Sequence, residues 1–294
     1  MFLEYVVDNK YINLKEILKL EFGMSERLIL KLKTNKRVYI NNDISNINTK
    51  INLNDKIRID FDFNEDNSNI IPKKMDLDII YEDDYYIVLN KPAGIPVHPS
   101  KLYYDNSLSN GLKHYYDNIG LKKKIRPVNR LDKDTSGIVI FAKNAYIQEC
   151  LIKQMKCKKF IKKYIAICEG RFKNKNGTIN LPIARKDNSI IERCINQSGD
   201  TAITHYNVLK TTNDLSLLEC ILETGRTHQI RVHLSSIGHP IISDTLYGNK
   251  STLIGRQALH AYKVNFIHPI FKRDVIYSLS LPDDFKKICN KLSI

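Results

Sequence analysis

A polar loop that runs into an apolar strand carries the residues best suited to chemistry. Residues 126–143 read RPVNRLDKDTSGIVIFAK, so the acid Asp132 follows the cation Arg130 just before a strand expected over 138–142. Loops supported by a buried strand often hold catalytic side chains. A plain turn with a capping aspartate accounts for the local pattern equally well. The loop alone therefore nominates Asp132 without deciding its role.

A second polar segment, residues 225–233 with the sequence GRTHQIRVH, opens a helix expected over 227–238. The N-terminus of a helix attracts anions, so Arg226 could hold a phosphate there. Arg231 lies beside the apolar stripe of this helix, and a partly buried arginine needs a carboxylate partner. Asp132 is one candidate partner, and a structural ion pair with another acid is the alternative.

Other chemistries fit the sequence less well. His228 and His233 are five residues apart and face different sides of a helix, which disfavours a shared metal ion. The pair Asp132 and Asp134 resembles the paired aspartates of phosphatases, but polar residues rather than an apolar strand precede it. Ser136 has no Gly-x-Ser-x-Gly elbow around it. The six cysteines show no C-x-x-C or zinc-like spacing, which favours reduced thiols in the cytoplasm.

The charge of the chain points to a polyanionic partner. Lys and Arg number 46 against 32 Asp and Glu, which gives +14. Residues 1–62 hold 11 basic and 9 acidic residues, so the remaining +12 lies in the rest of the chain. Residues 150–175 hold nine basic residues and one acid, a pattern that suits phosphate contacts as well as a solvated helix end. No apolar run reaches the ~20 residues that span a bilayer, and the N-terminus lacks a secretory pattern.

The order of the expected elements predicts an α+β fold with a mixed, largely antiparallel sheet, because helices do not alternate regularly with the strands. The polar stretch 64–69 suggests a small domain over 1–62, a linker over 63–75 and a larger domain over 76–294. Helices are expected over 26–33 after Ser25, over about 145–156 after Asn144, and over 227–238. Strands are expected over 38–40, 57–61, 79–81, 85–89, 138–142, 164–168, 202–209 and 215–222.

Residues 129–137, NRLDKDTSG, closely resemble the His-Arg-Leu-Asp-x-x-Thr-Ser-Gly signature of RluA-type pseudouridine synthases. The resemblance covers about residues 76–285, and further matching segments follow in the family's order: 90–99, 162–166, 224–234, 238–241, 244, 247–248 and 259–261. Residues 1–62 resemble a divergent S4-type RNA-binding module, in which Asn42 replaces an expected glycine. Asn129 stands where the family has histidine, which bears on RNA choice or loop geometry.

The resemblance implies isomerisation of uridine to pseudouridine within RNA, without a cofactor or a metal. Asp132 would be the essential aspartate, which attacks the flipped nucleotide or takes a proton from its ribose. Tyr164 would stack on the base and take part in removing the C5 proton, and Arg231 would keep Asp132 ionised and oriented. Arg130 would enter the space that the nucleotide vacates. The remaining residues expected to bind substrate are Asn129, Leu131, Thr135, Arg226 and His228.

The S4-like module favours structured RNA, such as the ribosomal RNA of the large subunit, over a small tRNA loop. We expect a monomer that acts in the cytoplasm and has no membrane partner. The competing hypothesis is an S4-type RNA-binding or ribosome-associated factor that has the same fold without catalysis. The joint presence of Asp132, Tyr164 and Arg231 favours the enzyme, since binding alone needs none of these three.

Overall fold

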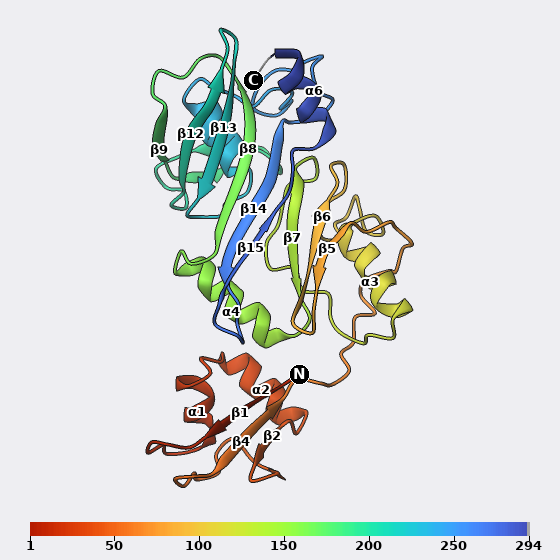
Figure 1. The fold of residues 1–294 in the computed structure, drawn as a ribbon, viewed down its shortest axis with the longest axis vertical. Helices are drawn as coiled ribbons and strands as arrows, with labels where there is room; N and C mark the ends of the chain where they lie inside the picture. Colours follow the sequence, from red (N-terminus) through yellow and green to blue (C-terminus); the bar gives the residue numbers. More distant parts are fainter. Residues whose placement is uncertain (293–294) are drawn as a thin grey trace.

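The computed structural model describes residues 1–292, and it shows a large unit above a small N-terminal unit (Figure 1). A sheet of nine strands in the order β5-β6-β7-β14-β8-β13-β12-β9, with β15 paired to β14, forms the large unit. Between the described strands of this sheet, only β7 and β14 pair in parallel. The predicted α+β fold with a largely antiparallel sheet is therefore confirmed.

The strands of the main sheet range from four to nine residues in length. Every residue of β7 is buried, as the apolar run over 138–142 predicts. The strands are β5 (Ile79–Glu82), β6 (Tyr86–Lys91), β7 (Ser136–Ala142), β8 (Ile161–Glu169), β9 (Asn176–Asn180), β12 (Ile203–Thr211), β13 (Leu215–Leu222), β14 (Leu259–Ile267) and β15 (Asp274–Ser278).

Four helices accompany the main sheet: α3 (Leu108–Asn118), α4 (Ala145–Lys156), α5 (Gln229–Ser236) and α6 (Asp283–Leu292). The helix α4 begins as predicted, because the side chain of Asn144 accepts a hydrogen bond from the backbone of Ile147. It packs against β7 and β14. No helix within residues 1–292 is long and apolar enough to cross a bilayer.

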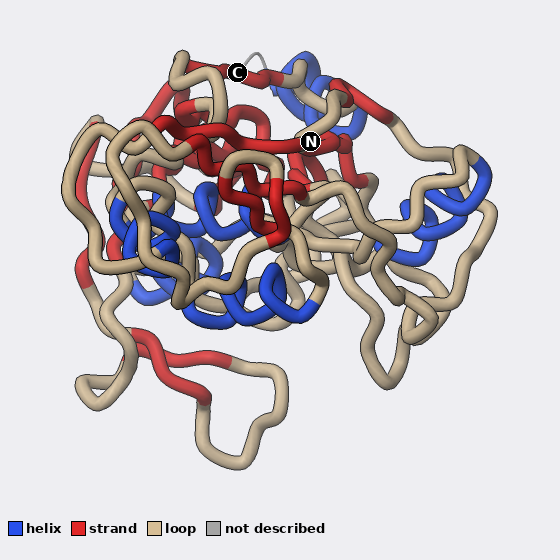
Figure 2. Tube along the Cα trace, turned by 90° about the horizontal axis from the view of Figure 1, so that it is seen from below, coloured by secondary structure: helices blue, strands red, loops and turns tan. Residues whose placement is uncertain are grey.

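The helix α5 is shorter than its predicted range of 227–238. It begins after His228, which has a left-handed backbone with φ of 59°, so the turn before it is not helical. At the other end Gly238 has φ of 83°, the left-handed stop that the sequence predicts. Between β9 and β12, the short strands β10 (Ile183–Arg185) and β11 (Arg193–Ile195) form a separate hairpin, which projects from the body in Figure 2.

The N-terminal unit is a four-stranded antiparallel sheet in the order β1-β4-β2-β3, covered by two helices. Ser25 caps the second helix by accepting a hydrogen bond from Leu28, as predicted. Its elements are β1 (Phe2–Val6), α1 (Leu14–Leu20), α2 (Glu26–Thr34), β2 (Val38–Ile40), β3 (Asp43–Ile44) and β4 (Lys56–Asp60). The identification of this unit as an S4 module stays a prediction.

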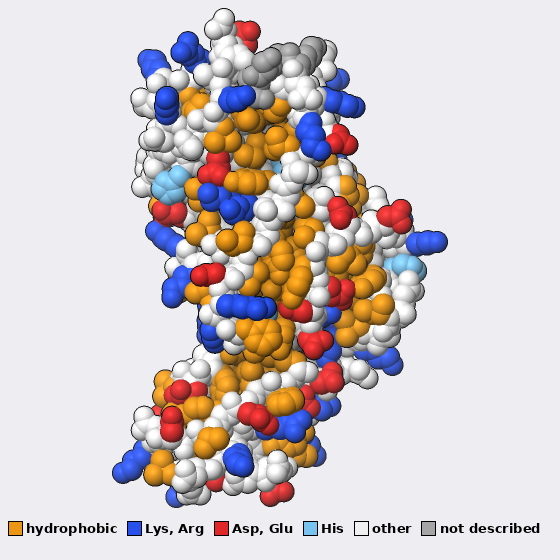
Figure 3. All heavy atoms as spheres, in the orientation of Figure 1, with side chains coloured by type: hydrophobic (Ala, Val, Ile, Leu, Met, Phe, Trp, Pro, Cys, Tyr) orange, Lys and Arg blue, Asp and Glu red, His pale blue; other side chains and the backbone are white. Residues whose placement is uncertain are grey.

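The two units share one hydrophobic cluster. Phe61, at the end of the small unit, stacks on Tyr146 of α4 with ring centroids 5.3 Å apart. The segment between β4 and β5 has no helix or strand, and its Ile70 is buried in the core of the large unit. Apolar side chains also run continuously across the junction in Figure 3. The domain boundaries at residues 62 and 76 stay a prediction, because the packing does not separate the units.

Candidate active site

All nine residues that the sequence nominates line one cleft of about 890 Å³. The nine come from three parts of the large unit that are far apart in sequence: the loop before β7, strand β8, and the segment from the end of β13 into α5. Residues 96–100, several residues between 155 and 160, and Leu259 complete the lining. The nine are Asn129, Arg130, Leu131, Asp132, Thr135, Tyr164, Arg226, His228 and Arg231. A cavity of this size is typical of ligand sites.

Short-range contacts with β7 fix the loop that carries Asp132. The side-chain amide of Asn129 donates to the carbonyl of Ile138 at 3.0 Å and accepts from the backbone of Ile140 at 2.9 Å. The side chain of Thr135 accepts a hydrogen bond from Gln257 at 2.7 Å. The polar groups of Asn129 and Thr135 thus hold the loop, because both side chains are buried and bonded to protein. Their contribution to substrate binding stays a prediction.

A glycine at the start of β7 allows the loop to sit close to β14. Gly137 has φ of 119°, and a Cβ built on it would lie 2.2 Å from the carbonyl oxygen of Ala261. Any side chain there would push β7 and β14 apart and break their short parallel pairing. The Thr-Ser-Gly part of the motif is thus a packing requirement of the strand that supports Asp132.

Arg231 contacts both acids that could be its partner. It donates to the two carboxylate oxygens of Asp244, from Nε at 2.7 Å and from Nη2 at 2.8 Å. Its Nη1 donates to Oδ2 of Asp132 at 3.0 Å. Burial alone would lower the pKa of Arg231, but Asp244 and then Asp132 raise it above its ordinary value. The predicted pair with Asp132 is present, and the fully buried Asp244 is the stronger, bidentate partner that the sequence analysis did not nominate.

Asp132 keeps one oxygen available to a substrate. The side chain is 26% exposed, whereas that of Asp244 is fully buried. Its Oδ2 faces Arg231, and Oδ1 makes no hydrogen bond to any group of the described chain. The carboxylate is therefore oriented by a fixed arginine while remaining open toward the cleft.

Tyr164 lies on β8 and is almost completely buried. Burial, and to a smaller extent the charge of Asp132, raises the pKa of Tyr164 well above its ordinary value of 10.0. The side chain is consequently a neutral phenol at physiological pH. Such a ring is suited to stacking on a base, whereas removal of a proton would need the phenolate that this environment disfavours.

His228 is connected to the cleft through a defined hydrogen-bond chain. The backbone N–H of Arg193 donates to the hydroxyl of Tyr247 at 2.8 Å, and that hydroxyl shares a hydrogen bond with Nδ1 of His228, also at 2.8 Å. The other ring nitrogen, Nε2, faces Oδ2 of Asp132 at 3.9 Å. Burial lowers the pKa of His228, which keeps the ring neutral. The sequence gives no local signal for the part that Tyr247 plays.

The two predicted arginines at the mouth of the cleft differ in their partners. Arg226 donates to the carboxylate of Asp200 at 3.1 Å and to the carbonyl of Thr201 at 3.1 Å. A phosphate at Arg226 would therefore compete with a carboxylate of the protein. Arg130 is exposed and has no ion-pair partner within the described residues. It is free to enter the cleft, as the resemblance implies.

The comparisons with known proteins agree on one family. A family model described as RNA pseudouridylate synthase matches residues 85–236. The RNA pseudouridine synthase YhcT of Bacillus subtilis (strain 168) is 39% identical over 275 residues, which cover 93% of this chain and 91% of the relative. Ribosomal large subunit pseudouridine synthase D of Zymomonas mobilis is 37% identical, covering 76% of this chain and 75% of the relative.

Solved structures show the same fold. Human RNA Pseudouridylate Synthase Domain Containing 1 is 26% identical with a TM-score of 0.58, and the match covers 70% of this chain and 84% of the human chain. Human RNA Pseudouridylate Synthase Domain Containing 4 superposes with a TM-score of 0.60 at 24% identity, covering 73% and 92% of the two chains.

Proposed function

The chain belongs to the RNA pseudouridylate synthase family, and from this premise we propose that it converts uridine to pseudouridine in ribosomal RNA with Asp132 as the essential carboxylate. The open carboxylate oxygen of Asp132, held next to Arg231 and Tyr164 in one cleft, carries this proposal. A large-subunit ribosomal RNA is favoured because several relatives, including the one from Zymomonas mobilis, bear that substrate in their names.

The reaction needs the uridine outside its helix, because a stacked nucleotide hides the bond between base and sugar. Extrusion costs a few kcal/mol, and stacking of the base on Tyr164 returns about 1–3 kcal/mol. Arg130, which is exposed and without a carboxylate partner, occupies the vacated space in the RNA. The cost of flipping is thus offset by two side chains of the same cleft.

Two paths are open to Asp132. In one, its oxygen bonds to C1′ of the ribose while the C1′–N1 bond breaks and leaves the electron pair on N1 of uracil. In the other, Asp132 takes the C2′ proton, the same C1′–N1 bond breaks, and that proton returns to C2′ later. In both, the uracil rotates, C5 bonds to C1′, C5 loses its proton and N1 gains one; in the first path the bond between Asp132 and C1′ breaks as C5 attacks, which restores the free carboxylate. A rate effect of deuterium at C2′ of the target would select the second path.

Arg231 positions Asp132 and is itself fixed by Asp244, so the reacting oxygen has little freedom before RNA binds. The neutral ring of His228 faces the same carboxylate through Nε2, at 3.9 Å. The proposed enzyme acts as a monomer in the cytoplasm, where ribosomal RNA is available as substrate.

The test is release of tritium from C5-labelled uridine in ribosomal RNA, because every conversion expels the C5 hydrogen. We expect release from large-subunit RNA and none from bulk tRNA. Mapping pseudouridines in cells with and without the gene then identifies the position. If the intact chain binds ribosomal RNA and releases no tritium from RNA or from ribosomal particles, it is the binding factor rather than the enzyme.

A further inference from the structure

Six cationic side chains line the cleft, and they fall into two groups by their partners. They are Arg130, Lys156, Lys158, Lys162, Arg226 and Arg231. Three are paired with acids: Lys158 with Glu223, Arg226 with Asp200, and Arg231 with Asp132 and Asp244. Within residues 1–292, Arg130 and Lys156 have no such partner but are exposed, so water solvates their charge. Lys162 belongs to neither group, since it has no acidic partner there and is only partly exposed.

Lys162 lies on the inner face of β8. It precedes Tyr164 by two residues, so both side chains point to the same side of the strand and both line the cleft. The neighbouring Lys163 points to the opposite side and pairs with Glu219 at 3.2 Å. Within residues 1–292, Lys162 makes no ion pair and no side-chain hydrogen bond. Burial lowers the pKa of Lys162, which expresses the cost of holding this charge without a counter-ion.

The space next to the Lys162 ammonium is kept open by a glycine. A Cβ built on Gly225 would lie 3.2 Å from Nζ of Lys162, closer than an ordinary contact. Gly225 has no left-handed backbone angle that would explain the choice of glycine. Gly225 lines the main cleft together with Lys162, and it also lines a second cavity of about 420 Å³.

We propose that Lys162 is the phosphate-binding residue of the cleft and that its ammonium contacts the phosphodiester next to the flipped uridine. This inference rests on the proposed function. Successive same-face residues on a strand are about 6–7 Å apart, so one nucleotide can place its base on Tyr164 and its phosphate near Lys162. A phosphate supplies the missing counter-ion and leaves the three existing ion pairs intact.

The first experiment measures kcat and KM on C5-tritiated ribosomal RNA for Lys162→Gln and Lys162→Arg. The proposed contact binds the substrate and the transition state equally well. Its loss in Lys162→Gln should therefore raise KM about 10- to 100-fold and leave kcat unchanged. Lys162→Arg should restore most of the affinity. Lys159→Gln is the matched control, because Lys159 is exposed, nearby and outside the cleft, and its KM should change less than about 3-fold.

The second experiment identifies the phosphate. An RNA fragment containing the mapped uridine is made with one uncharged methylphosphonate at either flanking linkage. At one linkage, wild type should lose as much affinity as Lys162→Gln, and the variant should lose nothing further. If the affinity lost at each methylphosphonate simply adds to the affinity lost in Lys162→Gln, Lys162 does not contact either phosphate. An unchanged KM for Lys162→Gln would also contradict the proposal.

Gly225→Ala tests the same site without removing a charge. The added methyl group crowds the Lys162 ammonium, so KM should rise in wild type and stay unaffected in the Lys162→Gln background. If Lys162→Gln melts well below wild type, Gly225→Ala is compared in wild type and in the Lys162→Arg variant. KM should then rise in both, because both keep a cation at position 162. Absence of tritium release by the wild-type enzyme would instead refute the proposed function itself.

Discussion

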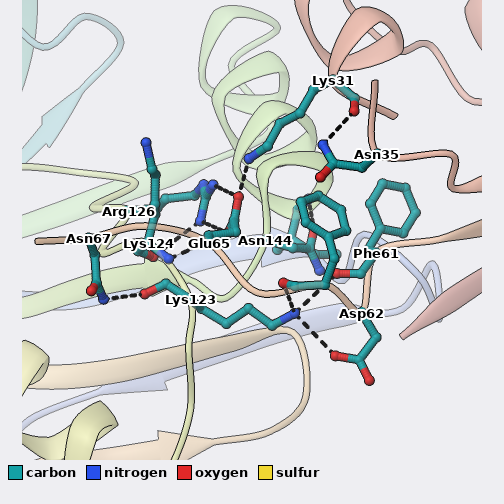
Figure 4. A network of polar contacts seen from close by, with 12 residues as sticks. Lys31, Asn35, Phe61, Asp62, Glu65, Asn67, Lys123, Lys124, Arg126 and Asn144 are labelled. Carbon is teal, nitrogen blue, oxygen red and sulfur yellow. Dashed lines mark hydrogen bonds and ion pairs between the residues drawn. The ribbon is translucent and has the colours of Figure 1, made fainter. Parts of the chain in front are cut away.

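Two clusters in this protein join an arginine to carboxylates, and they are built in opposite ways. At the junction of the two units, Glu65 accepts from Arg126 at 2.5 and 2.6 Å and also pairs with Lys31, so one acid meets two cations (Figure 4). In the cleft, Arg231 holds Asp132 and Asp244, so one cation meets two acids. The junction cluster is saturated, and the cleft cluster is not.

The difference separates a structural ion pair from a reactive one. The side chain of Glu65 is 5% exposed, and both of its oxygens are bonded. Burial alone would raise the pKa of Glu65, but Arg126 and Lys31 lower it below its ordinary value. Asp132 is 26% exposed and has a free oxygen. In the cleft, two carboxylates share one arginine, and Asp132 is partly exposed. Its carboxylate is therefore oriented and still accessible to a substrate.

Asp132→Asn should give the largest effect. It removes the reactive oxygen, and we expect pseudouridine formation to fall by at least about 10⁴-fold, the range seen when a nucleophile is removed. Stability should change by less than about 1 kcal/mol, because Asp244 still pairs with Arg231. Tritium release and urea unfolding measure the two quantities. Near wild-type turnover by this variant would show that the open acid is not the reactive one.

Arg231→Ala should affect both quantities. It leaves Asp244 buried without its cation, and breaking such a pair costs about 3–5 kcal/mol. It also releases Asp132, so activity of the folded fraction should drop strongly. Asp244→Asn is the companion variant, since it keeps Asp132 and Arg231 but removes the bidentate anchor. If both variants melt like wild type, the cleft cluster is not held together as the contacts indicate.

Arg126→Ala tests the saturated cluster. Because Lys31 continues to pair with Glu65, we expect a smaller loss of about 2–3 kcal/mol in the free energy of unfolding. Turnover at saturating RNA should be close to wild type, since the cleft lies elsewhere. Lys124→Ala is the control, because Lys124 lies beside the cluster and is exposed. A collapse of kcat in Arg126→Ala would mean that the junction also governs catalysis.

The loop that carries Asp132 is also held by a hydrogen bond between two neutral groups, which can be compared with the two ion-pair clusters. His260 on β14 bonds to the hydroxyl of Ser136 at 2.9 Å, and burial lowers the pKa of His260 from 6.5 to about 4. Below pH 6.5, His260 therefore becomes protonated in the unfolded chain while it stays neutral in the folded chain. Stability should fall by about 1 kcal/mol between pH 6.5 and 5.5 from this residue. Urea unfolding of His260→Gln across that range should show a correspondingly shallower slope.

The sequence predicted the elements whose signals are local. Asn144 and Ser25 cap their helices where expected, and β13 has the predicted bounds of 215–222. Elements without strong periodicity, such as β14 and the β10–β11 hairpin, were not predicted. The helix after Thr227 starts later than predicted because His228 has a left-handed backbone, which the local sequence pattern does not indicate.

By itself, the sequence determined the family and the mixed fold, and it nominated nine residues that line the cleft. It could do so because the family motifs occur in order along the chain. Only the tertiary structure decided how the residues are paired. Arg231 contacts Asp244 as well as Asp132, and Lys162 has no partner within residues 1–292. Both facts depend on which segments the fold brings together. Periodicity and caps act over a few residues, whereas Arg231 is 13 residues from Asp244 and 99 residues from Asp132.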